Sequence, residues 1–176
     1  MNLLIPSIPE IELVEKLGQF DEAFGNRLWT AFKNYGFAVV LGYNDVMYPD
    51  GLARKINSVL KKKLGLPDIN LIQNIEEKKL TGVVRGKHQR GLVFQRVEHS
   101  DECNFAVTNN YPNVSFWVKI SHPDSSHQWV LIPHKPNSFV VNVGDILAET
   151  SKGVLVSAPH KFIVEERLDQ VTFFYY

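Results

Sequence analysis

Residues 137–164, with the sequence NSFVVNVGDILAETSKGVLVSAPHKFIV, decide the expected fold class. The stretch contains short apolar runs that are typical of strands, among them Val154-Leu155-Val156 and Phe162-Ile163-Val164. Turn signals at Val143-Gly144-Asp145 and Lys152-Gly153 separate the apolar segments. Strand and turn patterns of this kind continue back to about residue 80, without helical patterns between them. This organisation indicates an antiparallel sandwich or barrel, and a jelly roll fits the number of strands.

The first part of the chain has a different pattern. Apolar residues recur at helical spacing from Phe20 to Tyr35 and again from Pro49 to Leu64. Between these expected helices, the apolar run 37–41 indicates a buried strand. We therefore expect a mainly β fold in which N-terminal helices brace a double-stranded β-helix (jelly roll). A single domain is expected over residues 1–176, with a helical part up to about residue 80 and the jelly-roll core after it.

The composition limits the expected partners and location. Lys plus Arg (19) equals Asp plus Glu (19), so no overall field attracts nucleic acid or an anionic membrane, and a small-molecule or protein partner is expected. The run Lys61-Lys62-Lys63 is expected in the last turn of a helix, where cations complement the helix dipole. Cys103 is the only cysteine, which fits a reducing compartment. Because Pro6 and Pro9 interrupt the apolar N-terminus, we expect no signal peptide or membrane span, and a cytoplasmic location.

Residues 97–103, VEHSDEC, supply candidate metal ligands. In a strand, residues two apart point to the same side, so His99 and Asp101 can converge on one ion. A third ligand is expected from His160, because a strand close to the C-terminus can lie beside a much earlier one in an antiparallel jelly roll. The histidines in or beside turn-rich segments are expected to face solvent: His122, His127 and His134. Taken alone, the triplet leaves open that His99 and Asp101 are ordinary polar residues.

This ligand set points to a particular chemistry. Two imidazoles and a carboxylate, with coordination positions left open, are the ligands of the non-haem ferrous oxygenases. The open positions admit dioxygen and an oxidisable co-substrate. A closed structural zinc site needs a fourth protein ligand, and Cys103 is the candidate. Three ligands at two-residue steps along one strand seldom surround a tetrahedral ion, so zinc ranks second to iron.

Residues 137–164 also resemble the C-terminal jelly roll of the iron(II)- and 2-oxoglutarate-dependent oxygenases, in the isopenicillin N synthase-like branch. Three segments occupy the places of that family's motifs in order: Asn142-Val143-Gly144-Asp145, Ser151-Lys152-Gly153 and Ser157-Ala158-Pro159-His160. Other segments look like the family's preceding strand, helix-to-strand junction and opening strand: Trp129-Val130-Leu131-Ile132-Pro133, Tyr35-Gly36-Phe37 and Ile8-Pro9-Glu10-Ile11. The resemblance covers most of the chain, with a gap around residues 65 to 95. It implies ferrous iron on His99, Asp101 and His160, 2-oxoglutarate as co-substrate, dioxygen, and oxidation of a small molecule.

The chain departs from the family where 2-oxoglutarate is expected to bind. The family's Arg-x-Ser pair aligns with Gln170 and Thr172, so the hydroxyl is kept and the positive charge is lost. Arg167 is the nearest replacement cation, but its odd spacing from Gln170 places it on the other side of a regular strand. Four further cations lie in the region without resemblance: Arg85, Lys87, Arg90 and Arg96. Two alternatives therefore stay open: an iron oxygenase of this fold that does not use 2-oxoglutarate, and a non-catalytic binding or scaffold member.

Overall fold

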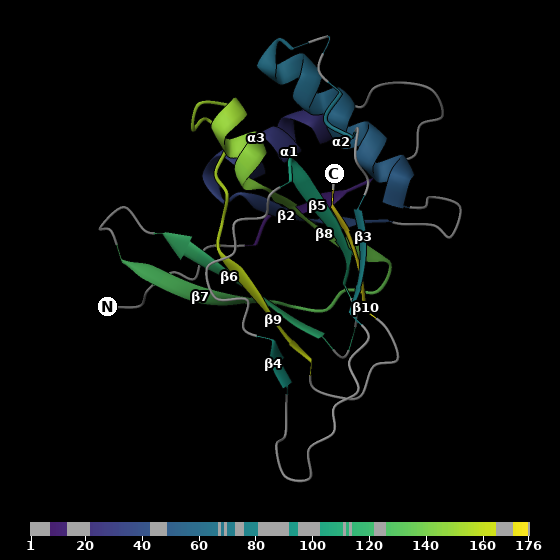
Figure 1. Ribbon diagram of the computed structural model, residues 1–176, viewed down its shortest axis with the longest axis vertical. Coiled ribbons are helices and arrows are strands. Elements are labelled where there is room, and N and C mark those ends of the chain that lie inside the picture. The colour runs from purple at the N-terminus through teal and green to yellow at the C-terminus, as the bar shows by residue number, and fades with distance from the viewer. Residues whose placement is uncertain are drawn as a thin grey trace.

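The structure is a computed structural model that describes residues 8–13, 22–42, 49–66, 68, 70–72, 76–80, 92–94, 103–110, 112, 114–121, 126–164 and 171–175. These residues form a mainly β structure with helices against it (Figure 1). The helices are α1 (Glu22–Asn34), α2 (Pro49–Leu64) and α3 (Asp145–Thr150). The strands are β1 (Glu10–Glu12), β2 (Phe37–Leu41), β3 (Glu76–Leu80), β4 (Leu92–Phe94), β5 (Phe105–Asn109), β6 (Val114–Ser121), β7 (His127–Ile132), β8 (Ser138–Val143), β9 (His160–Val164) and β10 (Val171–Tyr175).

The strands form two sheets. The larger has six strands in the order β1-β2-β8-β5-β10-β3, and the smaller has four in the order β4-β9-β6-β7. Neighbouring strands are antiparallel except β1 and β2, which pair in parallel. Strands β1 and β2 come from the N-terminal part of the chain, yet they extend the sheet formed by β8 and β5. Both parts of the chain therefore contribute to one sheet.

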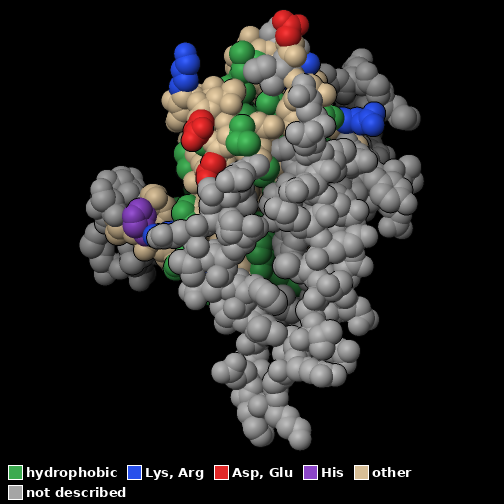
Figure 2. Space-filling view, in the orientation of Figure 1, with side chains coloured by type: hydrophobic (Ala, Val, Ile, Leu, Met, Phe, Trp, Pro, Cys, Tyr) green, Lys and Arg blue, Asp and Glu red, His purple; other side chains and the backbone are tan. Residues whose placement is uncertain are grey.

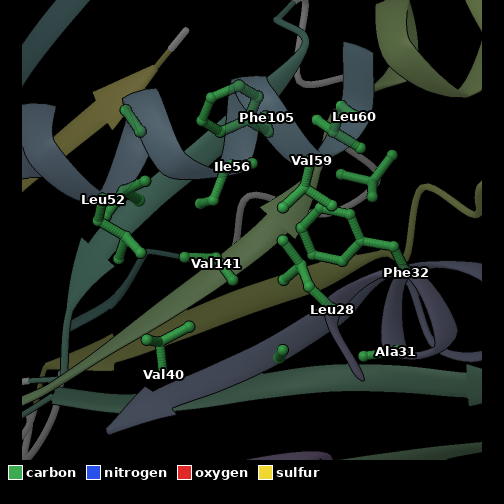
Figure 3. Close-up of a cluster of buried hydrophobic side chains, with 14 of the residues drawn as sticks. Leu28, Ala31, Phe32, Val40, Leu52, Ile56, Val59, Leu60, Phe105 and Val141 are labelled. Atoms are coloured by element: carbon green, nitrogen blue, oxygen red, sulfur yellow. The ribbon is translucent and has the colours of Figure 1, made fainter. Parts of the chain in front are cut away.

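Two apolar clusters divide the molecule into layers. The first, which we call the helix-side core, lies between α1, α2 and one face of the six-stranded sheet. It includes Phe32, Ile56 and Val141 (Figure 3). The second lies between the two sheets, where Val39 and Val140 pack with Phe116 of the smaller sheet. Full burial of such a side chain contributes about 1.5–3 kcal/mol. The layers are therefore helices, six-stranded sheet and four-stranded sheet.

The helices and the early strand confirm the sequence prediction. Helix α1, strand β2 and helix α2 lie in the segments expected for them. The three lysines occupy the last turn of α2, as predicted, and Lys63 Nζ donates to Asn26 Oδ1 of α1 at 2.5 Å. No helix in the described part of the chain is long and apolar enough to cross a membrane.

Two local predictions were wrong. Helix α3 follows Gly144 in a region expected to contain only strands and turns; its sequence DILAET contains good helix formers, and Leu147 is buried against the helix-side core. Residues Val154, Leu155 and Val156 are not a strand. Their backbone N–H groups bond outside any sheet: Leu155 donates to Ser151 Oγ at 3.0 Å and Val156 donates to the Phe32 carbonyl at 3.1 Å.

Some apolar side chains remain at the surface. Around α3, Ile146, Val154 and Val156 are exposed, and hydrophobic and acidic side chains lie side by side there (Figure 2). On the outer face of the four-stranded sheet, Lys161 Nζ lies 4.4 Å from the centre of the Trp129 ring. Scattered exposed apolar residues are normal in folded proteins, and a cation over an indole face adds modest stability.

Candidate metal centre

His160 begins β9 on the face that is turned toward the larger sheet. Its backbone is opposite Val118 of β6, and Phe162 is opposite Phe116. Val118, Phe116 and Phe162 all belong to the cluster between the sheets. Opposed residues in an antiparallel pair share a face, so the half-buried imidazole lies at the edge of this apolar layer.

Aromatic contacts and a hydrogen bond to a backbone carbonyl orient the imidazole ring. The ring stacks on Phe116, with centroids 5.5 Å apart and planes 15° apart, and it meets Phe162 edge-on at 5.8 Å. His160 Nδ1 lies 3.1 Å from the carbonyl oxygen of Ala158. A carbonyl only accepts hydrogen bonds, so Nδ1 carries the proton and, in the neutral ring, Nε2 carries the lone pair. Metal-binding histidines typically have this arrangement, with one nitrogen donating to a carbonyl and the other binding the metal.

The segment before β9 is fixed at several points. Besides the bonds of Leu155 and Val156, the N–H of Lys119 donates to the Pro159 carbonyl at 2.8 Å. Ala158 is buried in the cluster between the sheets. The carbonyl that orients His160 is thus part of a rigid connection, which explains why this histidine has a defined ring position.

The other two predicted ligands, His99 and Asp101, lie outside the described residues, but the chain is described on both sides of them. Before them, Phe94 of β4 is opposite Phe162 of β9, two positions from His160. His99 follows Phe94 by five residues, and five residues span at most about 18 Å. After them, the Asn104 carbonyl accepts a hydrogen bond from the N–H of Gly144 at 2.8 Å. The chain length between these described flanks is compatible with an approach of His99 and Asp101 to His160.

The remaining histidines of the described part do not compete as ligands of this centre. His127 and His134 are exposed, as predicted. His127 Nδ1 lies 3.1 Å from Ser121 Oγ, and His134 Nδ1 lies 2.7 Å from the Asn110 carbonyl oxygen. His88 and His122 lie outside the described residues. Over the described ranges, no three His, Cys, Asp or Glu side chains are grouped as metal ligands, and Cys103 is buried.

The residues predicted to bind 2-oxoglutarate fall at the edge of the described chain. Gln170 and Arg167 lie outside it, as do Arg85, Lys87, Arg90 and Arg96. Thr172 is in β10, where its backbone is opposite Lys79 of β3. Position 174 of the same strand is opposite Val107, which belongs to the helix-side core. The register of β10 with β3 is continuous from Val171 to Tyr175.

Sequence reasoning missed the residues that orient His160. Phe116 and Ala158 were not singled out, although both act on the imidazole directly. The alternating pattern of β6, VSFWVKIS, places Phe116 on the inner face, and this signal is present in the sequence. The pairing of β6 with β9 is a tertiary feature, so the contact itself could not be read from the pattern.

Comparison with solved structures identifies the fold. A protein assigned to the 2OG-Fe(II) oxygenase family from Caulobacter crescentus has a TM-score of 0.68 and 13% identity, over 96% of this chain and 86% of its own. AtDAO1, the dioxygenase for auxin oxidation from Arabidopsis thaliana, solved with 2-oxoglutarate, has a TM-score of 0.59 and 15% identity, over 95% and 90%. The dioxygenase for auxin oxidation from rice has a TM-score of 0.59 and 16% identity, over 96% and 82%. The chain therefore has the fold of these oxygenases.

The sequence itself gives no comparable match. No protein-family model matches it, and no curated protein shows a significant similarity.

Proposed function

We propose that this chain is a non-haem Fe(II) oxygenase that oxidises a small molecule with dioxygen, using 2-oxoglutarate as co-substrate. The orientation of His160 carries the proposal: in a fold shared with solved oxygenases, Nδ1 donates to the Ala158 carbonyl, which leaves Nε2 as the nitrogen proposed to bind the metal. The fold is a double-stranded β-helix (jelly roll), and residues 1–176 are one domain. The cytoplasm remains the expected location.

The proposed iron ligands are His99, Asp101 and His160. This set fits ferrous iron, because two imidazoles and one carboxylate leave positions open for dioxygen and a co-substrate. When bound, the iron supplies the activation of dioxygen. The chain's own contribution is orientation and shielding: Phe116 and Phe162 limit rotation of the His160 ring and present apolar surface beside it. Apolar walls keep water away from a reactive centre and strengthen electrostatic interactions within it.

The co-substrate is either 2-oxoglutarate or another reductant. AtDAO1, which shares the fold, was solved with 2-oxoglutarate, and this supports 2-oxoglutarate here. The proposed binding residues are Gln170, Thr172 and Arg167. Gln170 brings no charge to balance a buried carboxylate, and this favours the alternative in which another reductant is used. A binding or scaffold role without catalysis is the third candidate.

One experiment separates these functions. The protein is purified without air, its iron content is measured, and oxygen uptake and succinate release are followed with and without 2-oxoglutarate. We expect one iron per chain and succinate release that depends on 2-oxoglutarate. Bound iron with oxygen uptake but no succinate would favour the alternative oxidase, and a chain that binds no iron would leave only the scaffold role.

A further inference from the structure

The corner formed by Cys103 and Asn104 joins the predicted metal-binding segment to strand β5. Cys103 is buried, with 7% of its surface exposed, and β5 begins at Phe105. Asp101 precedes Cys103 by two residues in the chain. The position of this corner therefore limits where Asp101 can lie.

Gly144 holds the corner from one side. Its N–H donates to the Asn104 carbonyl at 2.8 Å. A Cβ atom at position 144 would lie 2.1 Å from the Cys103 carbonyl oxygen and 2.8 Å from Cys103 Sγ. The nearest of these is a backbone atom, which cannot turn aside as a flexible side chain can. The close approach of the two backbones therefore requires glycine at position 144.

Asn104 holds the corner from the other side. Its Nδ2 donates to the Leu71 carbonyl at 3.0 Å, and the Leu71 N–H donates to Asn57 Oδ1 of α2 at 3.2 Å. Leu71 is buried in the helix-side core, with 3% of its surface exposed. The corner is thus fastened to the helical layer through Asn104 and to the start of α3 through Gly144.

We infer that Gly144 and Asn104 are positioning residues for the metal-binding segment His99 to Asp101, an inference that rests on the proposed function. A side chain at position 144 displaces the corner by roughly 1 Å, because the close-packed surroundings give no room. Ligand distances in a metal site hold to about 0.2 Å. Asp101 is two residues from Cys103 in the chain, so we expect a displaced corner to shift this proposed ligand.

Two asparagines provide a matched test. Asn104→Ala and Asn57→Ala each remove one side-chain hydrogen bond to the backbone of Leu71, but only Asn104 belongs to the corner. Co²⁺ is titrated into each purified variant, and the affinity for Co²⁺ and the visible absorption spectrum of the complex are measured. Thermal unfolding of each metal-free variant is measured separately. We expect Asn104→Ala to weaken Co²⁺ binding about 10- to 100-fold and change the spectrum, while Asn57→Ala loses a similar amount of thermal stability and keeps the affinity.

The glycine is tested in the same way. Gly144→Ala should weaken Co²⁺ binding and alter its spectrum, whereas Gly153→Ala, at a glycine with no atom within 4 Å of the added Cβ, should not. If Gly144→Ala fails to fold, the comparison of Asn104→Ala with Asn57→Ala still tests the positioning role. Equal Co²⁺ affinity in wild type, Asn104→Ala and Asn57→Ala would overturn the positioning role. Absence of Co²⁺ binding by the wild-type protein would instead overturn the proposed metal centre itself.

Discussion

At the scale of single residues, His160 is the best-defined part of the candidate site. Its ring is fixed by Phe116, by Phe162 and by the Ala158 carbonyl. Because the hydrogen bond assigns the proton to Nδ1, the tautomer is determined by the protein. A histidine held in this way is prepared to bind a metal through Nε2 with little loss of rotational freedom.

We predict that His160→Ala abolishes metal binding while the chain stays folded. The expected loss of affinity exceeds the roughly 10- to 100-fold effect of removing a supporting partner, because a ligand itself is removed. His134→Ala is the matched control, since His134 Nδ1 also bonds a backbone carbonyl but the side chain is exposed. Iron content after anaerobic loading, with circular dichroism for folding, measures both. Equal iron in the two variants would contradict the assignment.

The second residue-scale prediction concerns Gln170. Gln170→Arg should strengthen 2-oxoglutarate binding, because an arginine can pair with a carboxylate through two hydrogen bonds and a full charge. Gln170→Leu is the control and should give no gain. Calorimetric titration of 2-oxoglutarate into the metal-loaded protein measures the change. If both variants behave alike, position 170 does not face the co-substrate.

At the scale of elements, the junction between α1 and β2 supports the segment that leads to His160. Gly36 lies at this junction with φ of 77°, in the left-handed region that favours glycine. A Cβ at Gly36 would lie 2.2 Å from the Val156 carbonyl oxygen. The helix end thus packs directly on the connection from α3 to β9.

Gly36→Ala should therefore destabilise the protein more than Gly65→Ala. Both glycines have positive φ, and a left-handed residue with a side chain costs about 1–2 kcal/mol. Only Gly36 adds a backbone clash, since no atom lies within 4 Å of a Cβ at Gly65. Urea unfolding of both variants measures the difference in unfolding free energy. Equal losses would mean that the junction relaxes without strain.

At the scale of the whole molecule, stability comes from the two apolar layers on either side of the six-stranded sheet. Phe32 is fully buried between α1, α2 and the sheet (Figure 3). By contrast, the ion pair between Lys135 and Glu10, at 3.1 Å, is exposed to solvent. Exposed ion pairs contribute about 0–1 kcal/mol, because water screens them.

We predict that Phe32→Ala lowers the free energy of unfolding by about 3–5 kcal/mol, because it leaves a cavity in the helix-side core. Glu10→Gln should change it by less than about 1 kcal/mol. Chemical unfolding followed by tryptophan fluorescence measures both variants. A larger effect of Glu10→Gln would show that the N-terminal strand depends on charge rather than on burial.

The sequence by itself determined most of the local elements and predicted the kind of site. Helical spacing predicted α1 and α2, because it reflects burial of one face of a helix. The apolar run 37–41 predicted β2, because it reflects burial of a whole short strand. The resemblance of residues 137–164 to the oxygenases predicted a fold that solved structures share. Helix α3 was not foreseen, because six residues are too few for a periodic signal.

Only the tertiary structure decided which distant segments meet. It placed β9 between β4 and β6, so that Phe116 and Ala158 orient His160. It also joined Gly144, Asn104 and Leu71 around the corner beyond Asp101. The physical reason is that local patterns record only whether a residue is buried, whereas the partner of a buried group depends on strand order and register, which the whole chain determines at once.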